Sequence, residues 1–326
     1  ITTAAVAVGD WVLAAPEQHR LTRVLDRKTE LSRSTEFHTG DKQLIAANLD
    51  TLFITSSCNN DFNVARLERY LALAHDAMVT PVILLTKADQ SDDPDSYIDQ
   101  ARALGRGLEV IALDAISHDV TAALAPWCGK GQTVALTGSS GVGKTTVANA
   151  LTGGDAATQG IREDDARGRH TTTGRSLHAM PSGGWLIDTP GMRGLGLAEA
   201  AFGINATFPE ISELIAQCKF RDCDHDTEPG CAVQAALADG TLPPDRYHRW
   251  QALGAEADDA RRRAERAAPP GDLLLCGHGA VGTLLWCHLA QAAIDRRHDQ
   301  PPGGGCLWSA PRGGRPTGGW QRMETW

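Results

Sequence analysis

The sequence lacks an apolar run long enough to cross a membrane. It also does not open with the basic and then apolar segment of a signal peptide. These two absences argue against a membrane protein and favour a cytoplasmic location. The first residue is Ile1 rather than Met, and we therefore expect the chain to begin inside a longer gene product.

An excess of positive charge is also absent, since the formal net charge at pH 7 is −9. This balance argues against a broad basic surface that would grip nucleic acid by charge alone. Two short clusters, at residues 162–170 and 261–266, are locally rich in arginine. Each is as consistent with a solvated face as with a basic patch.

The eight cysteines do not have the even usage of a disulfide framework. Three of them lie close together beside a histidine, in the pattern Cys218-x₄-Cys223-x-His225-x₅-Cys231. Three thiolates and one imidazole make a closed tetrahedral site for one structural Zn²⁺ ion. The Pro229-Gly230 turn lets the chain fold back onto the metal. The cysteines without comparable partners are Cys58, Cys128, Cys276, Cys287 and Cys306.

From about residue 44, apolar strand-like runs alternate with segments of helical spacing. We expect strands at 44–55, 81–86, 108–113, 133–137 and 185–187, and helices at 62–77, 96–104 and 120–127. This alternation is typical of an α/β domain with a parallel sheet and helices on both faces. Residues 1–40 contain short strands and turns that suit part of a small β-barrel, and residues 155–176 are expected to be a mobile functional loop.

A phosphate-binding loop is predicted at residues 138–145, GSSGVGKT, between an expected strand and an expected helix. Its glycines let backbone N–H groups turn towards phosphates, and the helix directs its positive end at the anion. Lys144 supplies a cation to the β and γ phosphates, and Thr145 offers its hydroxyl to Mg²⁺. The residues expected to bind nucleotide here are Gly138, Ser139, Ser140, Gly141, Val142, Gly143, Lys144, Thr145 and Thr146.

The tetrapeptide Thr86-Lys87-Ala88-Asp89 follows a buried strand, at the strand end where ligands bind in such sheets. The Asp89 carboxylate can accept hydrogen bonds from N1–H and the exocyclic amine of guanine, and adenine does not offer this pair. Thr86, Lys87 and Asp89 are therefore the predicted guanine-binding residues. Together with the phosphate loop they indicate GTP as the ligand.

A third motif, Asp188-Thr189-Pro190-Gly191, follows the last expected strand. Asp188 can hold Mg²⁺ through water, and the Gly191 N–H can meet the γ phosphate. One hydroxyl of Thr171, Thr172 or Thr173 completes the Mg²⁺ shell, and we favour Thr172 or Thr173 without separating them.

The guanine-binding motif precedes the phosphate loop, which reverses the usual order and predicts a circularly permuted GTPase domain. A second departure is Met192, which stands where many GTPases have a water-orienting Gln. Either a partner completes the catalytic site, or another group helps. Among the groups of this chain, Lys144 and His170 are the predicted catalytic residues.

These motifs resemble those of the ribosome small-subunit-dependent GTPase A (RsgA) family over about residues 8–267. The most specific parts are the permuted order, Gly-Arg-His-Thr-Thr-Thr at 168–173, Asp-Thr-Pro-Gly at 188–191 and the Cys₃His pattern. The resemblance implies an N-terminal OB-fold, a central GTPase domain and a C-terminal helical zinc domain. It also implies GTP hydrolysis in late maturation of the small (30S) ribosomal subunit, stimulated by that particle and its rRNA.

Against this pattern, the OB-fold starts partway through, and 59 residues follow Ala267. That tail contains Leu-Leu-Leu-Cys-Gly-His-Gly at 273–279 and resembles a fragment of a histidine phosphatase, in which His278 would sit at the phosphate. The nucleophile motif Arg-His-Gly is absent from the sequence, so we expect the tail to be a non-functional remnant.

We therefore divide the chain into a partial OB-fold (1–40), the permuted GTPase domain (41–205), the zinc-binding domain (206–267) and the tail (268–326). The expected ligands are GTP, Mg²⁺ and Zn²⁺, and the protein is expected to be a monomer. The alternative function is a guanine-nucleotide-dependent ribosome-binding switch with negligible catalysis, which Met192 and the incomplete OB-fold suggest.

Overall fold

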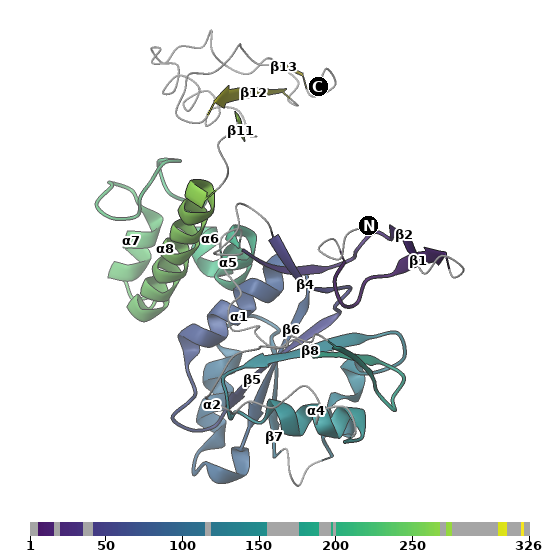
Figure 1. Ribbon diagram of the computed structural model, residues 1–326. Helices are drawn as coiled ribbons and strands as arrows, with labels where there is room; N and C mark the ends of the chain where they lie inside the picture. Colours follow the sequence, from purple (N-terminus) through teal and green to yellow (C-terminus); the bar gives the residue numbers. More distant parts are fainter. Residues whose placement is uncertain are drawn as a thin grey trace, which may run out of the picture. The chain divides into compact units, whose positions relative to one another are not determined.

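A computed structural model describes residues 6–15, 20–34, 42–114, 119–154, 176–188, 197, 200–267, 272–275, 306–311 and 321–322 (Figure 1). The chain divides into two compact units, Ile1–Arg266 and Ala267–Trp326. Within the described part, no helix combines the length and the apolar character that crossing a membrane requires.

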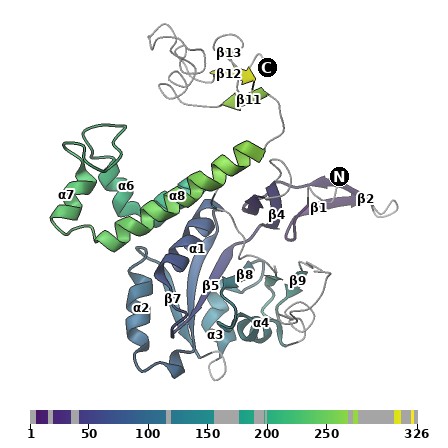
Figure 2. The same ribbon diagram turned by 60° about the vertical axis from the view of Figure 1, so that its left-hand side comes forward.

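A six-stranded sheet organises the first unit, in the order β7-β6-β5-β8-β10-β9. Its strands are β5 (Thr51–Ser57), β6 (Thr80–Thr86), β7 (Glu109–Leu113), β8 (Thr133–Gly138), β9 (Ser176–Ala179) and β10 (Trp185–Asp188). All pairings are parallel except β9 with β10, which is antiparallel at the edge. The parallel sheet predicted from the alternating pattern is confirmed, and β6, β8 and β10 end at the same edge (Figure 2).

Helices cover both faces of this sheet. On one face α1 (Val64–Asp76) and α2 (Pro94–Arg102) bury Leu71 and Ala101, and Asn63 and Asp93 cap their N-termini. On the other face α3 (Val120–Leu124) and α4 (Lys144–Thr152) pack with Phe53 and Leu186. The central strands β5, β6 and β8 are largely apolar because both of their faces are buried.

Two details of the strand prediction are wrong. The expected strand at 44–55 is two strands, β4 (Lys42–Ala47) and β5, separated at Asn48, whose φ of 53° turns the chain. Asparagine tolerates this left-handed conformation better than most residues. In addition, no strand was predicted between residues 137 and 185. The structure has β9 from Ser176, and β9 forms a hairpin with β10 through the turn at Pro181–Gly184.

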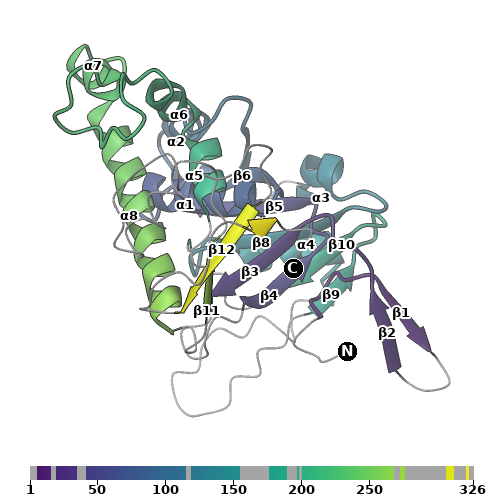
Figure 3. The ribbon, with the colours of Figure 1, turned by 90° about the horizontal axis from the view of Figure 1, so that it is seen from above.

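The N-terminal part consists of two hairpins, β1 (Val12–Ala15) with β2 (Arg20–Val24) and β3 (Glu30–Ser34) with β4 (Figure 3). They are separate two-stranded sheets. Short strands were expected here, and β4 extends them to residue 47. The OB-fold assignment stays a prediction.

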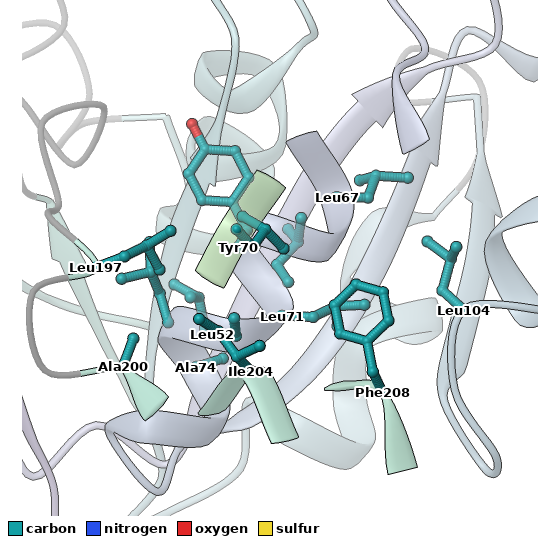
Figure 4. Close-up of a cluster of buried hydrophobic side chains, with 14 of the residues drawn as sticks. Leu52, Leu67, Tyr70, Leu71, Ala74, Leu104, Leu197, Ala200, Ile204 and Phe208 are labelled. Carbon is teal, nitrogen blue, oxygen red and sulfur yellow. The ribbon is translucent and has the colours of Figure 1, made fainter. Parts of the chain in front are cut away.

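The C-terminal helices of the first unit are α5 (Ala201–Thr207), α6 (Pro209–Ile215), α7 (Ala232–Ala238) and α8 (Pro244–Ala267). Helix α5 lies directly against α1, because Gly203 approaches the α1 backbone so closely that a Cβ there would be 1.9 Å from the Ala72 carbonyl oxygen. Ile204 and Phe208 pack with Leu71 in the buried cluster of Figure 4. The helical region after residue 205 thus continues the core on the α1 face of the sheet.

The second unit contains a three-stranded antiparallel sheet of β11 (Asp272–Leu275), β12 (Cys306–Pro311) and β13 (Gln321–Arg322). No strand was expected in the tail, so β11, β12 and β13 were missed by the sequence analysis. Glycine and proline dominate the segment from residue 301, and the strand residues 306–311 show no alternation that would mark them. His278 lies outside the described residues, and the resemblance of the tail to a phosphatase stays a prediction.

Candidate functional site

The predicted phosphate loop runs from the end of β8 into α4, as its sequence pattern requires. Gly138 has a φ of 139°, and a Cβ at this position would lie 2.1 Å from the Thr55 carbonyl oxygen, so only glycine fits. The Lys144 ammonium crosses the loop and donates hydrogen bonds to the carbonyls of Gly138 (3.1 Å) and Ser139 (2.5 Å). Val142 anchors the loop in the core, whereas Thr145 and Thr146 are exposed at the start of α4.

The predicted guanine-binding residues lie beside this loop. The buried Thr86 hydroxyl, at the end of β6, lies 2.6 Å from the Val142 carbonyl oxygen and 3.1 Å from that of Ser56. Lys87, in the left-handed conformation at φ 58°, donates from Nζ to the Gly141 carbonyl at 2.8 Å. Hydrogen bonds thus connect the guanine-binding segment to the phosphate loop, although the two are more than 50 residues apart in sequence.

Asp89 follows in a short 3₁₀ turn, η3 (Ala88–Gln90), and its carboxylate is exposed to solvent. The left-handed turn at Lys87 redirects the chain after β6 and places Asp89 just beyond the strand end. An exposed carboxylate at this point is available to accept hydrogen bonds from a base.

Asp188 ends β10, the strand next to β8, and therefore lies at the same sheet edge as the phosphate loop. Its Oδ2 atom is buried and has no hydrogen-bond partner among the described residues. Burial raises the pKa of Asp188, and the charge of the nearby His178 acts in the opposite direction. A buried carboxylate oxygen without a donor is suited to accept from a Mg²⁺-bound water, and the exposed Thr145 hydroxyl at the start of α4 would be available as a direct ligand.

Other residues singled out for this site lie outside the described residues. They include His170, Thr171, Thr172, Thr173, Gly191 and Met192.

The Cys₃His pattern is brought together in space, with all four ligand atoms within 4.8 Å of one another. Cys218 Sγ lies 3.9 Å from Cys231 Sγ and 3.5 Å from His225 Nδ1, and Cys231 Sγ lies 3.6 Å from the same nitrogen. Ordinary Zn–S and Zn–N bond lengths in a tetrahedron give about 3.8 Å between sulfurs and about 3.6 Å between sulfur and nitrogen. The donor set and its spacing therefore fit zinc.

The protein groups around this cluster support a cation. Burial, together with the neighbouring Cys231 and Cys218 sulfurs, raises the pKa of Cys223 to about 12. Clustered thiols resist ionisation unless a positive charge compensates them. The Cys231 sulfur also accepts a hydrogen bond from the Gln234 N–H at the start of α7.

His225 is held in a strained orientation by the surrounding helices. Its φ is 60°, and its carbonyl accepts hydrogen bonds from Gln234 Nε2 (2.6 Å) and the Tyr247 hydroxyl (3.0 Å). The imidazole packs edge-on against Trp250 of α8. The metal centre is thus joined to α7 and α8 by contacts that the ligand spacing alone does not reveal.

Sequence reasoning missed two groups of polar residues near these sites. Ser176 and His178 lie on β9, and their alternation with Leu177 before the Pro-Ser-Gly-Gly turn was the available signal of a hairpin strand. Glu68 on α1 is completely buried and pairs with Arg246 and Arg249 of α8. Its signal was a carboxylate on the apolar face of a helix.

Strand order and site together define a circularly permuted P-loop GTPase. The solved structure of YloQ, described as a circularly permuted GTPase, is similar with a TM-score of 0.54 and 26% identity over 79% of this chain and 82% of that chain. YjeQ from Thermotoga maritima has the same fold, with a TM-score of 0.55 and 23% identity over 77% of this chain and 84% of its own.

The chain belongs to the RsgA GTPase family, whose model matches residues 24–198. It is 58% identical to the small ribosomal subunit biogenesis GTPase RsgA of Mesorhizobium japonicum, over 78% of this chain and 75% of that protein. It is 49% identical to RsgA 2 of Vibrio vulnificus, over 80% and 75% of the two chains. The protein is therefore a GTPase, an enzyme that hydrolyses GTP.

Proposed function

We propose that this GTPase couples GTP hydrolysis to late maturation of the small (30S) ribosomal subunit, which stimulates the reaction. The relatives of highest identity described above carry this role in their names. The observation that most supports nucleotide control is the fastening of the guanine-binding segment to the phosphate loop, through Thr86 to Val142 and Lys87 to Gly141. Base recognition and phosphate binding then act as one unit.

In this proposal Asp89 accepts the guanine hydrogen bonds, and Lys144 moves from the loop carbonyls to the β and γ phosphates. Thr145 and Asp188 hold Mg²⁺, which offsets the negative charge that develops on the phosphates. The remaining proposed nucleotide contacts are Thr86, Lys87, Gly138, Ser139, Ser140, Gly141, Val142, Gly143 and Thr146.

Three further roles belong to residues outside the described part. Thr172 or Thr173 would complete the Mg²⁺ shell, Gly191 would contact the γ phosphate, and His170 would assist hydrolysis in place of the Gln that Met192 replaces. With that Gln missing, a group supplied by the ribosomal particle is expected to complete the site.

The test is steady-state GTP turnover with and without purified small ribosomal subunits. We expect the particle to raise the rate by at least on the order of 10²-fold, because a group supplied by a partner can contribute 10³-fold or more. Lys144→Ala is the control, and it should abolish both basal and stimulated turnover. Equal rates with and without the particle would contradict the coupled function, and GTP-dependent co-sedimentation without stimulated turnover would favour the binding switch.

We further propose that Cys218, Cys223, His225 and Cys231 hold one structural Zn²⁺ ion. Replacing Cys231 by Ser should reduce zinc in the purified protein from about one ion per chain to nearly none, because a four-ligand structural site does not tolerate loss of a thiolate. Inductively coupled plasma mass spectrometry measures the zinc content.

The matched control is Cys58→Ser, which changes a buried cysteine outside the cluster. It should leave the zinc content unchanged. Full zinc occupancy in the Cys231→Ser variant would refute the assignment of this ligand.

The domain divisions remain part of the proposal, namely a partial OB-fold, the GTPase domain, the zinc domain and the tail. Because β4 pairs with β3, we now place the first boundary near residue 48 rather than residue 40. We also propose that the protein is a cytoplasmic monomer and that it contacts rRNA on the ribosomal particle.

A further inference from the structure

Two polar side chains of β9 face the same side of the sheet as Asp188. In the antiparallel pairing Ser176 lies directly opposite Asp188, and His178 lies opposite Leu186. Leu186 packs in the core beneath α4, as does Met180, which follows His178 by two positions. Because side chains alternate along strands, Ser176, His178 and Asp188 all point to this α4-covered face.

The two β9 side chains contact each other. Ser176 Oγ and His178 Nε2 are 2.7 Å apart, and both residues are half-buried. Directly opposite residues of an antiparallel pair have Cβ atoms about 4.5–5.5 Å apart, which brings the Ser176 hydroxyl within reach of the Asp188 carboxylate. His178 is also close enough to Asp188 for its charge to act on the carboxylate.

In the described part of the chain, the Asp188 carboxylate lacks a hydrogen-bond donor that Ser176 could supply. Its buried Oδ2 atom has no hydrogen-bond donor among the described residues, and a buried carboxylate oxygen without a donor is energetically unfavourable. Ser176, whose hydroxyl already has one partner in His178, lies directly opposite Asp188 across the strand pair.

We propose that Ser176 and His178 are positioning residues that orient Asp188 for binding of a divalent cation. His178 donates from Nε2–H to Ser176 Oγ, and the Ser176 hydroxyl donates in turn to the Asp188 carboxylate. In this arrangement the imidazole N–H and the serine O–H each donate one hydrogen bond. The bond from His178 polarises the Ser176 hydroxyl and so strengthens its bond to Asp188. The inference rests on the proposed role of Asp188 as the carboxylate that holds Mg²⁺ through water.

A positioning role for Ser176 and His178 can be distinguished from a merely structural hydrogen bond by its effect on the response to Mg²⁺. A structural pair would affect stability and leave the response to Mg²⁺ unaltered. A positioning pair restricts the carboxylate to the orientation that accepts from the metal-bound water, so its loss weakens the effect of Mg²⁺ specifically. Outer partners of metal ligands typically contribute about 10–100-fold to metal affinity.

The experiment measures how fast the full-length protein releases GDP labelled with a methylanthraniloyl fluorophore, as a function of Mg²⁺ concentration. Ser176→Ala and His178→Ala should each raise the half-saturating Mg²⁺ concentration by about 10-fold or more. Release in excess EDTA should be unchanged, since no cation is then bound. Ser176→Thr and His178→Gln, which keep a hydroxyl and an N–H donor, should retain most of the Mg²⁺ response.

Leu177→Ala is the matched control, because Leu177 lies between the two residues on the opposite, exposed face of β9. If Ser176→Ala and His178→Ala respond to Mg²⁺ as Leu177→Ala does, the positioning role is wrong while the proposed function stands. If the unaltered protein releases the nucleotide at a rate independent of Mg²⁺, the proposed role of Asp188 fails and the inference fails with it. Should one alanine variant not fold, the other decides, because loss of either Ser176 or His178 breaks the chain of hydrogen bonds to Asp188.

Discussion

Replacing Asp89 by Asn is expected to lower the affinity for GTP by about 10²–10⁴-fold, because two hydrogen bonds to a charged acceptor are lost, each contributing about 1.5–3 kcal/mol. The Asn side chain presents one acceptor and one donor amide. Xanthine carries a carbonyl where guanine carries its exocyclic amine, so the same variant should bind xanthosine triphosphate better than GTP. The preference of the site would thus be inverted rather than merely weakened.

Competition against a fluorescent guanine nucleotide measures this inversion, with GTP, xanthosine triphosphate and ATP as competitors. Asp92→Asn is the matched control, since Asp92 is an exposed carboxylate three positions further along. It should leave all three affinities unchanged. If ATP binds with the same affinity as GTP to both the unaltered protein and the Asp89→Asn variant, the guanine assignment is wrong.

The largest expected loss of stability follows from replacing Glu68 by Gln. The Glu68 side chain is completely buried on α1 and accepts hydrogen bonds from Arg246 at 2.7 Å and from Arg249 at 2.7 and 2.9 Å. Arg246 also donates to the carbonyls of Thr207 and Leu104 and lies over the ring of Phe208. Removing the negative charge leaves the buried Arg246 guanidinium with only the partly exposed Glu210 as a charged partner, and breaking a buried ion pair typically costs about 3–5 kcal/mol.

Urea unfolding followed by circular dichroism gives the free energy of unfolding of the variant and of the unaltered protein. Glu210→Gln is the matched control, because Glu210 accepts from the same arginine at 2.7 Å but is substantially exposed, at 39%. An exposed ion pair contributes about 0–1 kcal/mol, so this variant should lose little. Equal losses for the two variants would mean that burial does not make the Glu68 interaction special.

Three nucleotide-binding motifs and the metal ligands were predictable from the sequence because each is a local unit. The phosphate loop needs a strand, glycines and a following helix, and all three are contiguous around residues 133–152. The Cys₃His ligands are spaced within 14 residues, so their convergence needs only a short loop. The order of the motifs also predicted the permuted sheet, since strand ends in a parallel sheet share one edge.

The local hydrophobic pattern was insufficient to predict strand boundaries where a single residue changes the direction of the chain. The apolar run at 44–55 has no break in hydrophobicity, yet Asn48 adopts a left-handed conformation and divides it between two sheets. β9 is only four residues long and follows a polar stretch, so its alternation was too brief to stand out. It is nevertheless β9 that brings Ser176 and His178 to the magnesium side of the sheet.

The sequence by itself predicted the ligand chemistry, with a carboxylate for guanine, a phosphate loop and a thiol-rich group suited to a metal ion. Only the tertiary structure decided how these parts are joined. Thr86 contacts Val142 across 56 positions and Glu68 contacts Arg246 across 178. The local pattern around Glu68 does not identify Arg246 as its partner. A partner so distant is fixed by how the helices pack, and packing depends on the shapes of all the buried side chains at once.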